Sequence, residues 1–178
     1  MLCFLAVFAI VSCKHEPDDP TPPAEEWKKG DLVVSPAQGA IFTQEGKFQF
    51  KIAVEYSEGD NIEFHMKCSE AVTKLDVREG GANNTVFESF VIDEDTEKDS
   101  DGWYKISVSS DKVSPDEGQY LGLTARLPDE ARDNCFVAIR NLKIGNQAID
   151  FSAFIGEEDA LVDVYYDRPD KLNIKIHN

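Results

Sequence analysis

Apolar residues occupy every second position in several stretches of the chain, and this spacing predicts β-strands. The clearest stretch holds Phe48, Phe50, Ile52, Val54 and Tyr56 with mostly polar residues between them. One face of such a strand is buried and the other is solvated. The alternation recurs over residues 62–68, 121–127, 149–155 and 172–176, and the stretch ALVDVYY at 160–166 is a further candidate strand.

Turn-forming residues separate these stretches, and no long stretch has the period of a helix. The turn sequences are SEGD at 57–60, GGANN at 80–84, DSDG at 99–102, SPDEG at 114–118 and Gly-Asn at 145–146. Many short strands at this spacing predict an all-β fold, an antiparallel two-sheet sandwich of the jelly-roll or immunoglobulin-like type. Residues 31–178 have the length of one domain with a real core.

The first twelve residues, MLCFLAVFAIVS, are almost entirely apolar. This run is too short to span a bilayer as a helix and is typical of a secretory signal. Ile10, Val11, Ser12 and Cys13 match the pattern of a bacterial lipobox, which predicts that Cys13 is lipidated and becomes the mature N-terminus. No Lys or Arg precedes the run, a departure that a start further upstream would explain. A short hydrophobic N-terminal strand is the alternative.

Residues 13–30 follow as the lipidated cysteine and a tether rich in proline and acidic residues. Such a segment has too few apolar groups to offset the entropy lost on ordering. The charged residues directly after Cys13 resemble the signal that sends some Gram-negative lipoproteins to the exterior face of the outer membrane. Trp27, near the end of the tether, is expected to cover the edge of the domain rather than serve as a ligand platform.

The composition argues against a nucleic-acid partner and gives little support to catalysis. The formal net charge is −16, so there is no basic patch to displace the counterions of phosphates. Of the three histidines, only His65 lies inside the predicted fold, with no serine or cysteine partner on its face. No phosphate loop, zinc spacing or distinctive pair of carboxylates is present. We therefore expect a non-catalytic protein without a cofactor.

The stretch from Phe48 to about Ile155, about two-thirds of the sequence, resembles cohesin domains, and two segments within it carry the resemblance. The sequence NIEFHMKCSEAVTKLDVREG at 61–80 is similar to a cohesin strand, turn and strand, and YLGLTARLPDEARDNCFVAIRNLKIGN at 120–146 is similar to a later cohesin segment. Cys68 and Ser69 replace the Tyr-Asp of the family turn. Cohesins are nine-stranded jelly-roll sandwiches that bind dockerin modules through one sheet face, so the resemblance implies a binding module.

The resemblance implies a contact face on the strand at 62–68. With Ile62, Phe64 and the other even-numbered residues pointing inward, Asn61, Glu63 and His65 point outward. Asn61 and Glu63 fall where cohesins present the polar and acidic residues that bind a dockerin helix. A solvated strand face without a partner is the alternative.

Cys68 and Cys135 are the two cysteines within the predicted fold, each on the apolar face of its strand. Two buried free thiols are expected, with a disulfide as the alternative in an oxidising compartment. Metal binding by them is not expected, because His65 points to the face opposite Cys68.

The acidic run DEDTEKDSDG at 93–102 invites a calcium interpretation. Read as an EF-hand loop from Glu97 it has Asp99 and Asp101 at useful spacings, but Val108 stands where a bidentate Glu is required. A solvated hairpin loop is the better interpretation, and weak calcium binding is left open.

Aromatic residues supply a second hypothesis for the ligand. Trp103 follows the acidic loop and Tyr165 lies in a late candidate strand, and outward rings of this kind stack on sugars. The sequence thus predicts a lipid-anchored module on the cell surface that docks a surface protein or dockerin-like module. The alternatives are binding of a polysaccharide, or a structural role in a surface or adhesion assembly with residues 161–176 as the pairing edge.

Overall fold

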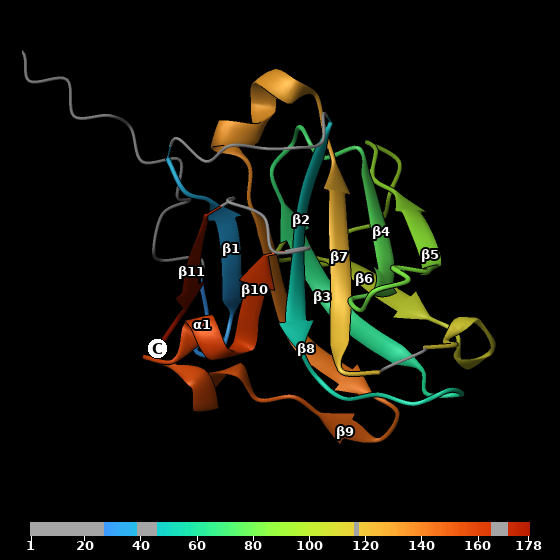
Figure 1. Cartoon of the computed structure of the whole chain (residues 1–178). Coiled ribbons are helices and arrows are strands. Elements are labelled where there is room, and N and C mark those ends of the chain that lie inside the picture. The colour runs from blue at the N-terminus through green and yellow to red at the C-terminus, as the bar shows by residue number, and fades with distance from the viewer. Residues whose placement is uncertain (1–26, 39–45, 116–117, 165–170) are drawn as a thin grey trace, which may run out of the picture.

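The computed structural model describes residues 27–38, 46–115, 118–164 and 171–178, which form two antiparallel sheets packed face to face (Figure 1). One sheet has the strand order β11-β1-β8-β3-β6, with a short β9 also paired to β8. Its strands are β1 (Leu32–Pro36), β3 (Ile62–Cys68), β6 (Tyr104–Val108), β8 (Val137–Ile144), β9 (Gln147–Ala148) and β11 (Leu172–Ile176).

The second sheet has the order β10-β2-β7-β4-β5. Its strands are β2 (Lys47–Ala53), β4 (Lys74–Glu79), β5 (Val86–Val91), β7 (Tyr120–Arg126) and β10 (Val162–Val164). The two-sheet sandwich predicted from the sequence is confirmed, and β10 and β11 are each an edge strand of their sheet. Within the described residues, helical structure is confined to short segments: α1 (Glu158–Leu161) and the 3₁₀ turns η2 (Ser110–Lys112), η3 (Asp129–Asn134) and η4 (Phe151–Phe154).

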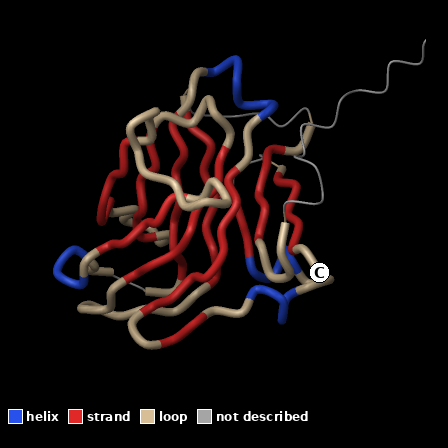
Figure 2. Tube along the Cα trace, turned by 180° about the vertical axis from the view of Figure 1, so that it is seen from behind, coloured by secondary structure: helices blue, strands red, loops and turns tan. Residues whose placement is uncertain are grey.

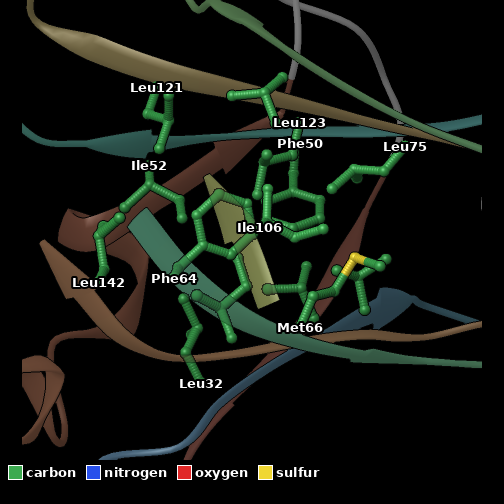
Figure 3. Packing of buried hydrophobic residues seen from close by; sticks show 14 of the residues in the cluster. Leu32, Phe50, Ile52, Phe64, Met66, Leu75, Ile106, Leu121, Leu123 and Leu142 are labelled. Carbon is green, nitrogen blue, oxygen red and sulfur yellow. The ribbon is translucent and has the colours of Figure 1, made fainter. Parts of the chain in front are cut away.

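The alternation of apolar residues places one half of each strand in a common core. Phe50, Ile52 and Leu123 from one sheet point toward Phe64 and Met66 of the other (Figure 3), and all five are fully buried. Transfer of a side chain of this size from water into the core stabilises the fold by roughly 1.5–3 kcal/mol. The remaining half of each strand forms the outer faces of the sandwich.

The strand expected over residues 149–155 is wrong. Here β9 ends at Ala148, and a 3₁₀ turn, η4, follows. The carboxylate of Asp150 accepts hydrogen bonds from the backbone N–H and the hydroxyl of Ser152, at 2.9 and 2.6 Å. This capping stabilises the helical turn. Phe151 still reaches the core, so an apolar spacing that looks like a strand is satisfied by a helical turn.

The acidic run at 93–102 is a connection between the sheets and not a hairpin loop. It leaves β5, an edge strand of the five-stranded sheet, and enters β6, an edge strand of the six-stranded sheet.

Figure 2 shows the molecule from behind, on the side of the six-stranded sheet. Among the described residues no helix is long and apolar enough to cross a membrane.

We expect Gly118→Ala to destabilise the sandwich much more than Gly59→Ala. Both glycines have a positive φ, +62° and +87°. A Cβ at Gly118 would lie 2.2 Å from the carbonyl oxygen of Tyr56, whereas a Cβ at Gly59 meets nothing within 4 Å. The conformational penalty alone should cost about 1–2 kcal/mol at Gly59, and the clash should raise the loss at Gly118 to about 3 kcal/mol or more. Urea denaturation of both variants checks this, and equal losses would contradict it.

Candidate binding site

Polar and charged side chains line up across the outer face of the six-stranded sheet. Strand β3 lies between β8 and β6, and His65 is opposite Arg140 on one side and Lys105 on the other. Two residues earlier in β3, Glu63 is opposite Lys143. Directly opposed residues in antiparallel strands have neighbouring side chains on the same face, so the sheet register assembles these groups from three strands.

The line of charge continues past β8 to the edge of the sheet. Asp31 directly precedes β1, and its backbone C=O accepts a hydrogen bond from the N–H of His177 at 3.0 Å. Burial raises the pKa of the Asp31 carboxyl, against the opposing effects of the Lys28 backbone N–H and of the Arg140 and His177 charges. Burial also lowers the pKa of His177, with the Lys175 charge acting in the same direction.

A β-bulge in β8 shapes this face. His65 is paired with Arg140, but Glu63 is paired with Lys143, so β8 has one residue more than β3 over this interval. Asn141, within the bulge, has φ +56°, a left-handed conformation that Asn tolerates better than most residues. A bulge bends its strand and changes the direction of its side chains. Here it keeps both Arg140 and Lys143 on the outer face.

Arg140 is the most enclosed cation of the site, with 8% of its surface exposed. Its guanidinium lies 4.1 Å from the centroid of the Trp103 ring, a favourable cation–π distance. One terminal nitrogen contacts the Asp99 and Asp101 carboxylates at 3.3 and 3.6 Å. Its buried Nε atom has no hydrogen-bond partner among the described residues.

Trp27 closes the face beside Arg140. Its ring stacks on His177 with the centroids 5.4 Å apart, and it meets Trp103 and Phe136 edge to face at 5.9 and 6.0 Å. The backbone then turns, with the Lys28 N–H donating to the Asp31 carboxylate at 2.8 Å. Residues 27–30, assigned to the tether from the sequence, therefore belong to the folded part. Trp27 covers the outer face of the sheet rather than its edge.

These elements surround an open hollow of about 780 Å³. Strands β3 and β8 form its floor, residues 28–31 and 148–151 stand on one side, and Lys105 of β6 on the other. Five of its side chains are basic and three are acidic: Lys28, Lys29, Lys105, Arg140 and Lys143 against Asp31, Glu63 and Asp150.

The residues predicted as a contact face are only partly brought together. Glu63 and His65 line the hollow, whereas Asn61 is not among its lining residues. The backbone C=O of Asn61 instead accepts a hydrogen bond from the Gly145 N–H at 2.8 Å, just before β3 begins. Two of the three predicted contact residues, Glu63 and His65, therefore lie at the hollow together with residues of β8, and whether this face binds a partner stays a prediction.

The aromatic hypothesis does not fit the structure at Trp103. This side chain is 1% exposed, packed in a small cluster with Trp27, Val33 and Ala138. It therefore offers no ring face to a sugar. Tyr165 lies outside the described residues, as does Cys13.

Two carboxylates of the acidic loop, those of Asp99 and Asp101, contact Arg140, and Asp99 also holds the loop. One oxygen of Asp99 accepts the backbone N–H groups of Asp101 and Trp103, both at 2.9 Å. These bonds, the Trp103 N–H first, and the Arg140 charge lower the pKa of Asp99. In the part of the chain that the structure describes, no group of three His, Cys, Asp or Glu side chains is placed to hold a metal ion.

Cys68 and Cys135 are free thiols in the structure, in agreement with the expectation of unbridged cysteines. Cys68 is opposite Val137 in β8, and Cys135 lies two residues before Val137, so the two cysteines occupy neighbouring positions at one end of the β3–β8 pair. Burial raises the pKa of each thiol to about 12.

The sequence did not point to Lys105, Arg140 or Lys143. The alternation in β8 and β6 identifies their outer faces, but only the strand pairing shows that those faces adjoin His65 and Glu63. No protein-family model matches the chain, and no curated protein matches it. The geometry of this face is therefore the basis for assigning a function.

We expect neither thiol to react with a disulfide reagent at pH 8 in the folded protein. With a pKa of about 12, each thiolate is a minute fraction at that pH, and the thiolate is the reactive species. The measurement is the rate of reaction with an aromatic disulfide in a Cys3→Ser, Cys13→Ser variant, where Cys68 and Cys135 are the remaining thiols. Denaturant should expose two fast-reacting groups, and fast reaction without it would disprove the expectation.

Proposed function

We propose that this protein is a lipid-anchored, non-catalytic binding module of the cell surface that docks a protein partner through the outer face of its six-stranded sheet. The observation that supports this proposal is the hollow formed by Glu63, His65, Lys105, Arg140 and Lys143. Charged side chains from three paired strands meet there on a rigid β framework. Docking through one sheet face is also what the resemblance to cohesins implies.

The state of the polar groups favours binding over a purely solvated face. Within the described residues, the buried Nδ1 of His65 and Nε of Arg140 have no hydrogen-bond partner. A buried donor or acceptor left unpaired costs roughly 1–3 kcal/mol. Both atoms are covered by neighbouring groups, so a partner would recover part of that cost by shifting these side chains and supplying hydrogen-bonding groups.

The chemistry of the face favours docking over catalysis. Glu63 and His65 alternate along β3 and point outward beside lysine and arginine side chains. Among the described residues that line the hollow there is no serine, threonine or cysteine to act as a nucleophile. Complementary charge across an interface guides encounter and fixes orientation, which is the role we assign to these groups.

Lipidation at Cys13 gives the first test. We expect Cys13→Ser to abolish incorporation of an alkyne-labelled fatty acid in the parent cell, because the thiol accepts the lipid. The Cys3→Ser variant is the matched control, since this cysteine lies in the same apolar run and outside the lipobox pattern. Gel fluorescence after labelling gives the readout. Equal labelling of the Cys13→Ser variant and the unmodified protein would disprove the anchor.

Photo-crosslinking in intact cells tests the docking face. A photoreactive phenylalanine analogue at Glu63 should yield a discrete crosslinked protein, because this position lines the hollow. The control places the same analogue at Gln49, a half-buried β2 position on the outer side of the opposite sheet.

The crosslinks distinguish the possible outcomes. A product from Glu63 and none from Gln49 supports docking through the six-stranded sheet. A product from Gln49 alone places the contact on the other sheet and overturns the proposed face. No product from either position overturns protein docking itself.

A further inference from the structure

The hollow is basic although the protein is strongly acidic. The chain has 18 Lys and Arg residues against 34 Asp and Glu, yet basic side chains outnumber acidic ones around the hollow, five to three. Two of those acids have intramolecular partners: Asp31 accepts the Lys28 N–H, and Asp150 accepts Ser152. Among the lining residues the sign of charge is therefore opposite to that of the whole molecule, while Asp99 and Asp101 stand just outside the lining, beside Arg140 and Lys28.

Two lysines in the hollow have their charge available. Lys105 and Lys143 are exposed, and neither forms an ion pair with a described residue. By contrast, Lys28 is engaged with Asp101 at 2.9 Å. Lys105 and Lys143 belong to β6 and β8 on opposite sides of β3, so a group seated over His65 lies between these two strands.

Arg140 adds a donor that the fold leaves unused. It is more than nine-tenths buried and lines the hollow, and its Nε is without a partner in the described part of the chain. The Trp103 ring and the Asp99 carboxylate hold the guanidinium in place. A guanidinium fixed in this way keeps one orientation, which suits the charge-assisted hydrogen bonds that a carboxylate accepts.

The lining favours a protein segment over a glycan. Of the aromatic residues at the hollow, Phe64 and Phe151 are in the core, and the neighbouring Trp103 is enclosed. No described lining residue therefore offers an exposed ring for stacking on a sugar. The available groups are ammonium and guanidinium donors, which recognise charge.

We propose that the hollow seats a carboxylate from an acidic segment of the docked protein, held by Arg140, Lys105 and Lys143. This inference rests on the proposed function and specifies the chemistry of the partner. Glu63, on the same floor, repels acids placed elsewhere and so helps to fix where the carboxylate sits. The attraction decreases as salt screens the two exposed lysines.

Nuclear magnetic resonance titration of the full chain in mild detergent tests the proposal with defined probes. The first probe is a capped peptide of alternating Glu and Gly, and the second replaces each Glu with Gln. We expect the Glu peptide to give saturable shifts at the backbone amides of His65, Arg140 and Asn141 and at the Trp103 indole. The Gln peptide should give none. Oligogalacturonate serves as a third probe, which presents carboxylates on a glycan.

Lysine variants locate the charge that matters. The double variant Lys105→Gln, Lys143→Gln should weaken binding of the Glu peptide by about tenfold or more, as expected for the loss of two favourable charge contacts. The double variant Lys171→Gln, Lys175→Gln is the matched control, because both lysines are exposed and lie outside the hollow. It removes the same charge from the chain and should leave the affinity unchanged.

Each result bears on one claim. Equal loss in the double variant and the control shows a non-specific charge effect and overturns the site. Tighter binding of oligogalacturonate than of the Glu peptide overturns the protein source of the acid. Failure of all probes overturns the carboxylate site, whereas a crosslink from Glu63 would still support docking on this face. The two proposals therefore fail separately.

Discussion

The register between β3 and β8 is the constraint on which the rest of this structure depends. Ile62, Phe64 and Met66 of β3 must face the opposite sheet, because together they form the centre of the core. Once that face is fixed, Glu63 and His65 must face outward, because successive side chains of a strand point to opposite faces. The pairing with β8 then determines which charged groups stand beside them. The extra residue at Asn141 shifts this pairing by one position between His65 and Glu63. The apolar residues of β8 before and after the bulge still face the core.

The same register places Arg140 beside the acidic loop at 93–102, and this gives the loop a structural role. Its sequence suggests a place for a cation, and the cation that it meets is Arg140. Asp99 and Asp101 lie at the rim of the sheet and contact the guanidinium from the solvent side, while Trp103 lies against it. An arginine on an open strand face would be hydrated and mobile. Enclosed in this way it becomes a fixed element of the surface, because its orientation is determined before any ligand arrives.

The sequence predicts the architecture well because strand alternation is a local property. The strands containing Phe50, Phe64 and Leu123 were all evident from spacing, and so was the burial of their apolar halves. It predicts poorly where a local pattern has two solutions. Phe151 reaches the core from a 3₁₀ turn capped by Asp150, at a spacing that a strand would also satisfy. Residue types at 149–155 do not separate these solutions without the tertiary context.

The candidate site was predictable only in part, for a related reason. The outward direction of Glu63 and His65 follows from their own strand. Their neighbours come from β6 and β8, separated from β3 by some 40 to 80 positions in the chain. No local sequence pattern shows which strands pair at that separation. Trp103 shows the same limit of sequence reasoning, for a residue whose predicted role the structure does not support. Its position next to a polar loop suggests an exposed ring, but Trp27, from the distant N-terminal segment, covers it.

The position of Trp27 has a mechanical consequence. The chain enters the sandwich on the same face as the hollow, and β1 follows at once, paired along one side with β11 and along the other with β8. In a protein held by its N-terminal side, tension applied at the hollow runs along this one sheet toward Trp27. It loads the hydrogen bonds between β1 and β8 in shear, and both β11 and the five-stranded sheet lie outside the path of the force. A pull along this path would therefore not act on the contact between the two layers.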